Sequence, residues 1–249
     1  MQRQLGCLLL LLFSALPCFA DCESLGNAWA EKLHPGLKLD SGLLACKSMP
    51  DDDTKTILVL PFESEGQPDP IEQPVRDVDI LIVENNEKLV SRFFQKNVWS
   101  ADAFAFDGAV IDTARYRLNP QDRAFGVSVG RSNSHHGGGG SISELTLYVA
   151  RKGNIVPVLE VETYSLMQFN EMESDNCTYS YTEVKRTLAL AHTISHGYAD
   201  IVLSESKHID EATPTDGKCK SSKVNEKKKY LLHFDGKQYV VPTEVQGQL

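Results

Sequence analysis

Residues 107–161 read DGAVIDTARYRLNPQDRAFGVSVGRSNSHHGGGGSISELTLYVARKGNIVPVLEV. Apolar and polar residues alternate through most of this stretch, and glycine, proline or asparagine stands at each interruption. Such alternation is typical of antiparallel strands that bury one face and expose the other. The stretch therefore predicts a meander of β-hairpins, around which the rest of the chain is organised.

Runs of the same kind precede this stretch. Residues 56–60 predict a strand, and residues 78–84 and 88–95 predict a hairpin around Asn85-Asn86. Asparagine suits that turn because it tolerates the left-handed backbone of a tight hairpin.

Further strands are predicted after it, at 163–169, 178–193 and 199–203. Residues 204–228 are polar throughout and predict a loop, and 230–242 predict a closing hairpin. The short turns shared by these hairpins suggest a weak internal repeat, which leaves open whether the sheet forms propeller-like blades, a sandwich or a barrel.

One helix is predicted, at residues 22–33. Leu25, Ala28, Trp29 and Leu33 recur there at helical spacing. The fold class is therefore all-β, an antiparallel meander of hairpins with a short N-terminal helix.

Residues 1–20 predict a cleaved secretory signal peptide. Arg3 precedes a short apolar run, and Ala20 precedes the expected cleavage site. Acylation of Cys18 or Cys22, which would make a lipoprotein, fits less well because small residues are wanted next to the modified cysteine. The expected divisions after the signal are a helix and disulfide segment, 21–55, and a β-rich domain, 56–249.

The mature chain keeps four cysteines, Cys22, Cys46, Cys177 and Cys219. In an exported protein they predict two disulfides. Three pairings are possible, and sequence proximity favours Cys22–Cys46 and Cys177–Cys219. None stands at the short spacing of a zinc site. The compartment expected is the periplasm, and no segment after the signal is apolar enough to cross a membrane.

Charge argues against nucleic acid as a partner. The formal net charge is −9, and it becomes −10 when Arg3 leaves with the signal. Affinity for nucleic acid depends mostly on lysine and arginine, so an acidic chain is a poor ligand. One basic cluster is interpreted as a solvated loop, or alternatively as a contact for an acidic partner or a membrane surface. It comprises Lys218, Lys220, Lys223, Lys227, Lys228 and Lys229.

Histidine offers weak candidates for metal binding. His192 and His196 stand four residues apart, which can place both rings on one face, and His135 and His136 are adjacent. No carboxylate or cysteine falls at a matching close spacing. Incidental surface histidines are therefore the preferred interpretation, and no cofactor is expected.

The glycine-rich segment is the candidate binding loop. It lacks the Lys-Ser/Thr ending and the following helix of a phosphate-binding loop, so it predicts a flexible hairpin tip that could serve as a contact surface. Its residues are Ser134, His135, His136, Gly137, Gly138, Gly139 and Gly140.

No catalytic residue is assigned. The chain has no Gly-x-Ser-x-Gly, and its mature cysteines are expected in disulfides. Asp77 and Asp79 are interpreted as charges that protect an edge strand from aggregation. The turn at 51–53 lacks the spacing of a calcium loop. Charged residues of the central strands are interpreted as cross-strand ion pairs; they are Asp112, Arg115, Arg117, Arg123 and Glu144.

Five blocks carry a resemblance: CKSMP (46–50), DTARYRL (112–118), RAFGV (123–127), ELTLY (144–148) and PVL (157–159). They resemble a family of exported, uncharacterised proteins of proteobacteria, common in pseudomonads. The resemblance implies a periplasmic β-rich fold and no particular substrate. His135-His136 and the lysines near 227 depart from the family's pattern.

Together these features favour a non-enzymatic periplasmic binding or inhibitory protein that acts through sheet faces and loops. An immunity protein against a secreted effector would be one such case, and the expected partner is an envelope or secreted protein. The alternative is an envelope hydrolase that uses acidic residues or a histidine-bound metal. The sequence leaves the oligomeric state open.

Overall fold

The computed structural model describes residues 22–65, 75–101, 103–170, 177–216 and 218–246. Within these ranges the chain forms one α-helix and one sheet of eleven strands, so the all-β class with a short N-terminal helix is confirmed. The signal segment lies outside the described residues. The elements are α1 (Cys22–Leu33), β1 (Ala45–Met49), β2 (Asp52–Glu63), β3 (Val75–Glu84), β4 (Lys88–Ser100), β5 (Ala105–Asp112), β6 (Ala124–His135), β7 (Gly138–Arg151), β8 (Asn154–Asn170), β9 (Tyr179–Ser195), β10 (Tyr198–Thr215) and β11 (Lys218–Leu232).

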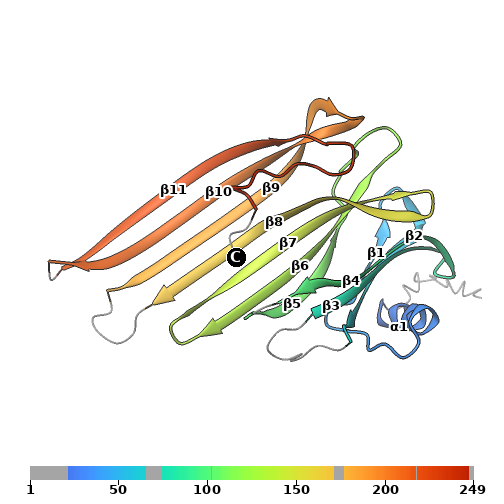
Figure 1. Ribbon diagram of the computed structural model, residues 1–249, viewed down its shortest axis with the longest axis horizontal. Coiled ribbons are helices and arrows are strands. Elements are labelled where there is room, and N and C mark those ends of the chain that lie inside the picture. The colour runs from blue at the N-terminus through green and yellow to red at the C-terminus, as the bar shows by residue number, and fades with distance from the viewer. Residues whose placement is uncertain (1–21, 66–74, 102, 171–176, 217, 247–249) are drawn as a thin grey trace, which may run out of the picture.

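The sheet has the order β1-β2-β3-β4-β8-β7-β6-β5, with β9, β10 and β11 added beside the outer half of β8 (Figure 1). All ladders are antiparallel except the contact of β4 with β8, where Arg92 pairs with Asn154 in parallel. The sheet does not close. Its edges β1 and β5 approach each other, and the Lys47 ammonium donates a hydrogen bond to the Ile111 carbonyl over 3.1 Å.

We call the inner part of the molecule the body: α1, β1 to β7, residues 154–162 of β8, and residues 189–203 and 231–246, which pack against β7 and β8. The sheet bends back on itself there, so that β2 and β3 face β6 and β7 across a buried cluster. Ile57 and Ile80 meet Phe125 and Val127 in that cluster, and all four are at most 3% exposed. Helix α1 covers the other face of β2 and β3, with Trp29 buried against them. A third cluster joins β7 and β8 to β10 and the C-terminal segment.

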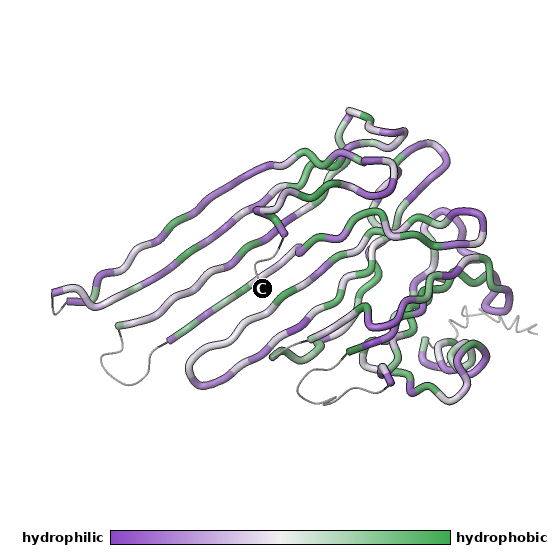
Figure 2. The backbone as a smooth tube through the Cα atoms, in the orientation of Figure 1, coloured by the Kyte–Doolittle hydropathy of each residue, from purple (hydrophilic) through white to green (hydrophobic). Residues whose placement is uncertain are grey.

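We call the outer part the wing: residues 163–170, 179–188, 204–215 and 218–230, on β8, β9, β10 and β11. Its strands run side by side away from α1 (Figure 1), and residues 138–143 of β7 pair along the outer half of β8. Their backbone is mostly pale or purple in Figure 2, whereas green concentrates in the body. The wing therefore has no core of its own comparable to the body's.

Both predicted disulfides are confirmed. Cys22–Cys46 joins the start of α1 to β1, and Cys177–Cys219 joins the chain before β9 to the start of β11 at the tip of the wing. A loop of 42 residues closed by a disulfide is stabilised by about 4 kcal/mol on the chain-entropy model. The second disulfide therefore provides stabilisation that the wing does not obtain from buried apolar surface.

One prediction about local structure is wrong. Residues 204–228 are not a loop, because β10 and β11 pair without interruption from Ile201–Leu232 to Thr215–Lys218. The expected division between residues 55 and 56 falls inside β2, which starts at Asp52. The closing hairpin predicted at 230–242 is present as a turn at Asp235, with an antiparallel bridge between Phe234 and Tyr239.

The glycine-rich segment contains the tip of the β6–β7 hairpin, and most of it belongs to the two strands. Ser134 and His135 end β6, Gly138 begins β7, and only His136-Gly137 form the turn. A Cβ atom on Gly138 would overlap the backbone oxygen of Gln168 in β8, and Gly138 has a φ of +148°. Glycine is needed here for close approach of two strands, which sequence alone cannot distinguish from loop flexibility.

Candidate binding face on the wing

One face of the wing carries an ordered array of polar side chains. Direct cross-strand partners point to the same side of a sheet, so the ladders define five rows that we call the wing face. From the body outward they are Thr187–Ser204–Lys229, then Tyr164–Lys185–Ser206–Lys227, then Leu166–Glu183–His208–Asn225, then Gln168–Tyr181–Asp210–Lys223, and at the tip Asn170–Tyr179–Ala212–Ser221.

Hydrogen bonds and ion pairs connect neighbouring rows. The Tyr179 hydroxyl donates to Asp210 Oδ1 over 2.6 Å, and the Lys223 ammonium binds Asp210 Oδ2 over 2.6 Å. Similarly, the Tyr164 hydroxyl donates to Glu183 over 3.3 Å, and Lys185 pairs with Glu183 over 2.8 Å. The network fixes the side chains while leaving the face open to solvent.

These bonds also orient two tyrosine rings. Tyr179 and Tyr164 each reach a carboxylate one row away on another strand, and such diagonal neighbours lie about 7–8 Å apart at Cα. The rings must therefore lean across the sheet. A leaning ring offers part of its apolar surface to a ligand and keeps its hydroxyl in a hydrogen bond.

The carboxylates of the wing face are held as anions. Hydrogen bonds from Lys223 and then Tyr179 lower the pKa of Asp210, and a hydrogen bond from Lys185 lowers the pKa of Glu183. Correspondingly, the hydrogen bond to Glu183 raises the pKa of Lys185. Charged groups stay charged at neutral pH, which suits recognition through salt bridges and charge-assisted hydrogen bonds.

Two shallow depressions lie on the wing. The lysine depression, of about 570 Å³, is lined by Lys185, Thr187, Ser204, Glu205, Ser206, Lys227, Lys228 and Lys229. The tip depression, of about 450 Å³, is lined by Gln168, Asn170, Tyr179, Ser180, Tyr181, His208 and Asp210. Their side chains are mainly those of the wing face, so one continuous surface contains both.

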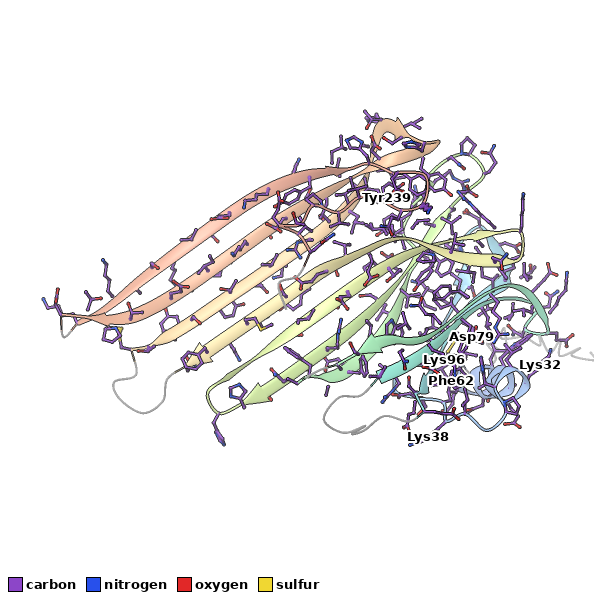
Figure 3. All side chains as sticks on the ribbon, in the orientation of Figure 1. Lys32, Lys38, Phe62, Asp79, Lys96 and Tyr239 are labelled. Atoms are coloured by element: carbon purple, nitrogen blue, oxygen red, sulfur yellow. A yellow bond between two sulfur atoms is a disulfide. The ribbon has the colours of Figure 1, made fainter. Side chains whose placement is uncertain are left out.

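A second cluster of chemical interest is buried in the body. Asp79 is fully buried and accepts hydrogen bonds from Arg92 Nε over 3.0 Å, and its Oδ2 lies 2.7 Å from His34 Nε2. The His34 ring packs between Phe62 and Phe94, with centroid distances of 4.7 and 4.6 Å. Figure 3 shows Asp79 and Phe62 beside α1. Because Asp79 is closed off on all sides, we assign the cluster to fastening the end of α1 onto the sheet.

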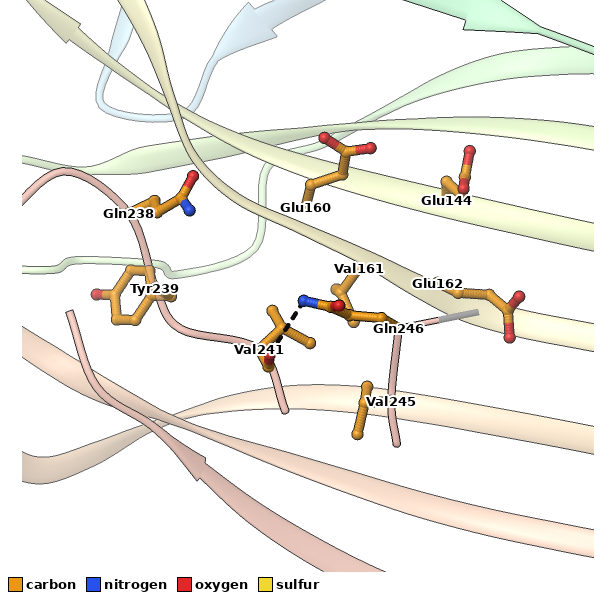
Figure 4. Close-up of a pocket in the computed structure, with 9 residues that line it drawn as sticks. All are labelled: Glu144, Glu160, Val161, Glu162, Gln238, Tyr239, Val241, Val245 and Gln246. Atoms are coloured by element: carbon orange, nitrogen blue, oxygen red, sulfur yellow. Dashed lines mark hydrogen bonds between the residues drawn. The ribbon is translucent and has the colours of Figure 1, made fainter. Parts of the chain in front are cut away.

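The C-terminal segment covers a further pocket of about 310 Å³, shown in Figure 4. Glu144, Glu160 and Glu162 line one side, and Val241 and Val245 line the other. Arg131 binds Glu144, and Arg186 binds Glu162 over 2.9 Å. Two of the three carboxylates are therefore already neutralised by arginine, and the pocket belongs to the packing of the tail.

The structure separates the predicted histidine candidates. His196 lies in the turn between β9 and β10, with Nδ1 2.8 Å from the Phe234 carbonyl oxygen, while His192 lies on β9. His135 ends β6 and His136 is in the next turn. Among the described residues no three His, Cys, Asp or Glu side chains lie close enough together to hold a metal ion.

Asp77 and Asp79 do not protect an edge strand. Strand β3 lies between β2 and β4, and the two carboxylates are 4% and 0% exposed. Asp77 accepts hydrogen bonds from the Ser64 hydroxyl over 2.6 Å and from the backbone N–H of Asn97 over 2.9 Å. The edge-strand prediction is wrong because alternation identifies a strand without identifying its neighbours.

The charged residues of the central strands form separate pairs. Arg117 and Arg123 both bind Asp51, and Asp112 accepts a hydrogen bond from Tyr116 over 2.7 Å. The hydrogen bond from Arg123 lowers the pKa of Asp51. Glu144 binds Arg131 elsewhere, so these residues do not gather into a single site.

Sequence reasoning missed the wing face, although a signal for it exists. Lys223, Asn225, Lys227 and Lys229 stand at every second position, as do the polar residues at 204, 206, 208 and 210. This is the period of a strand, but with only Ile209, Ala212 and Val224 apolar between 204 and 228 the run gave too little contrast between a buried and an exposed face.

No helix of the described chain is long and apolar enough to cross a bilayer. Comparison with protein-family models, with curated proteins and with solved structures finds no match for this chain.

Proposed function

We propose that this protein is an exported, non-enzymatic binding protein that holds an oligosaccharide on the wing face. The observation that carries the proposal is the five-row array of hydroxyl, amide, phenol and lysine groups on an open sheet face. A sugar chain is extended and rich in hydroxyl groups. It can pack its ring faces on tyrosine and exchange hydrogen bonds with fixed polar side chains.

Export is supported by the covalent framework. Two disulfides suit an oxidising compartment such as the periplasm, and they are rare in the cytosol. The predicted signal and the resemblance to exported proteobacterial proteins point the same way. We therefore place the proposed ligand outside the cytoplasm, on the cell envelope or beyond it.

A binding role is favoured over the hydrolase alternative by the state of the acids on this face. Asp210 and Glu183 each have a lysine and a tyrosine as partners. Their lowered pKa values disfavour the protonated form that a general acid needs. The alternative ligand of the wing face is a protein, such as a secreted effector that this chain would neutralise as an immunity protein. The test must distinguish it from an oligosaccharide.

The test uses the mature chain with both disulfides formed, titrated with a panel of neutral and acidic oligosaccharides. Tyr181→Ala is expected to weaken binding about two- to tenfold, because loss of one aromatic contact removes about 0.5–1.5 kcal/mol. Phe169→Ala is the matched control, since Phe169 is 49% exposed and its partner Ser180 lies outside the wing-face rows.

Binding that depends on Tyr181 and not on Phe169 would support the proposal. Absence of binding to every saccharide, or recovery of a stoichiometric protein partner whose capture Tyr181→Ala abolishes, would overturn it. Circular dichroism of each variant verifies that the sheet is intact.

A further inference from the structure

We propose that the two inner rows of the wing face form a subsite for an anionic group, a phosphate, sulfate or carboxylate carried on the bound oligosaccharide. The inference rests on the proposed function, because it names the class of saccharide that the face selects. It is carried by six side chains that line the lysine depression: Lys185, Thr187, Ser204, Ser206, Lys227 and Lys229.

The geometry concentrates cations around hydroxyl groups. Ser204 pairs directly with Thr187 and Lys229, and Ser206 pairs with Lys185 and Lys227. Adjacent strands are about 4.8 Å apart, and residues two apart on a strand are separated by about 6.7 Å. Three ammonium groups on flexible stems therefore surround a hydroxyl-lined floor about the size of one oxyanion with its hydration shell.

Two of these lysines lack a carboxylate partner. Within the described part of the chain neither Lys227 nor Lys229 makes an ion pair, whereas Lys185 is bound to Glu183. The nearest acid across the sheet, Glu205, is on the other face and is bound by Arg186 over 2.8 Å. The whole wing face has four lysines and two carboxylates, in a protein whose net charge is −9.

The hydroxyl groups are also free to donate. Thr187, Ser204 and Ser206 have no side-chain hydrogen bond to other described residues. An oxyanion accepts hydrogen bonds from hydroxyl and ammonium groups alike, and charge-assisted hydrogen bonds of this kind are about twice as strong as neutral ones. The depression offers three ammonium groups and three hydroxyl donors, and its one carboxylate, Glu205, is already bound by Arg186, so it favours an anion over a neutral sugar.

The position of the subsite fits a polymer. Lys185 and Tyr181 lie four residues apart on β9, a distance of about 13 Å along the strand. One saccharide chain laid along the strands could therefore place sugar rings at the tip depression and an acidic substituent at the lysine depression.

The competing explanation is that the lysines only protect an edge. Strand β11 is an edge of the sheet, and lysine on an edge strand discourages pairing with another chain. That explanation applies equally to Lys218 and Lys220, which are exposed on β11 near the tip and outside the lysine depression. Substituting each group of lysines separately therefore distinguishes the two explanations.

The experiment compares K227Q/K229Q with K218Q/K220Q, two double variants of one strand with the same change in charge. Binding of each to a sulfated hexasaccharide, an oligogalacturonate, inorganic phosphate and neutral maltohexaose is measured by calorimetry. K227Q/K229Q is expected to weaken binding of both acidic saccharides about tenfold or more, because the charge-assisted hydrogen bonds of both ammonium groups are lost. K218Q/K220Q is expected to stay within about twofold, a change of about 0.4 kcal/mol.

Inorganic phosphate is expected to bind more weakly than the acidic saccharides. Loss of phosphate binding in K227Q/K229Q, with binding kept in K218Q/K220Q, would support the subsite. Equal weakening by both double variants would overturn it in favour of diffuse edge charge. Tyr181-dependent binding of maltohexaose with no preference for acidic saccharides would overturn the subsite and leave the proposed function standing. Binding confined to anionic lipid vesicles, with no saccharide bound, would overturn both.

Discussion

The body and the wing each hold a carboxylate between two partners, and the two carboxylates differ in burial. In the body, Asp79 lies between His34 and Arg92 and is fully buried. In the wing, Asp210 lies between Tyr179 and Lys223 with its side chain 17% exposed on an open sheet. A carboxylate held by two partners therefore stabilises the fold in the body and orders surface side chains in the wing. Losing a partner destabilises the protein more in the body, because water can hydrate the remaining group only in the wing.

The largest expected effect is that of Asp79→Ala. Removing one member of a buried ion pair leaves the others uncompensated and costs about 3–5 kcal/mol. We expect the lower end of that range, because the Arg92 side chain is 33% exposed and can be hydrated. Urea unfolding followed by tryptophan fluorescence measures the loss, since Trp29 and Trp99 both lie in the body.

Asp210→Ala is the matched variant on the wing. We expect its unfolding midpoint to equal that of the unchanged protein, because its partners remain in contact with water. Equal destabilisation by the two substitutions would show that burial is not what distinguishes the body from the wing.

A difference of similar size is expected from apolar side chains. Leu58 is fully buried between β2 and α1, and Leu58→Ala should lower the free energy of unfolding by about 2–5 kcal/mol. Met167 on the wing is 41% exposed, and Met167→Ala should change it by less than about 0.5 kcal/mol. Thermal denaturation of the two variants compares them directly. A large loss for Met167→Ala would reveal a hidden core in the wing.

The smallest of the three effects concerns Tyr198, which is 1% exposed in the body and donates a hydrogen bond to Asp122 over 2.8 Å. Burial, and then this hydrogen bond, raise the pKa of Tyr198 to about 12. The unfolded chain releases the same proton near pH 10. The folded state therefore keeps this contribution below pH 10 and loses it as the pH rises toward 12.

Tyr198→Phe should cost about 1 kcal/mol at pH 7 and should reduce the further loss between pH 10 and 12. Urea midpoints at pH 7, 10 and 11 measure both effects. On the wing, Tyr179→Phe removes a partly buried hydrogen bond at the open face of the sheet and should change the pH 7 midpoint less than Tyr198→Phe does. An identical alkaline loss in the Tyr198→Phe variant and the unchanged protein would contradict the assignment.

The comparison also separates what could be predicted from what could not. Helix α1 matches the predicted residues 22–33, and the Asn85-Asn86 turn has the positive φ angles, 51° and 62°, that asparagine suggested. In the body, apolar side chains alternate with polar ones and mark each strand. In the wing both faces are largely polar, so residues 204–228 gave no contrast, although they form two of the longest strands.

The candidate site depends on strand order, and that is why sequence reasoning missed it. Lys185, Ser206 and Lys227 are more than twenty residues apart in sequence and become neighbours only through the pairing of β9, β10 and β11. The predicted loop at 134–140, by contrast, was identified from glycines that serve close strand packing. Period-two patterning assigns a side chain to a face of its own strand, and it carries no information on which strand lies alongside.

The sequence by itself determined the all-β class, the N-terminal helix and the hairpin turns, and it favoured the pairing of the cysteines that the structure shows. These follow from local backbone preference, alternation and proximity along the chain. Only the tertiary structure decided that Asp79 is buried beneath α1, that β3 is an inner strand and that the lysines of β11 face the hydroxyl groups of β10. These features arise from contacts between distant segments, which local preference does not specify.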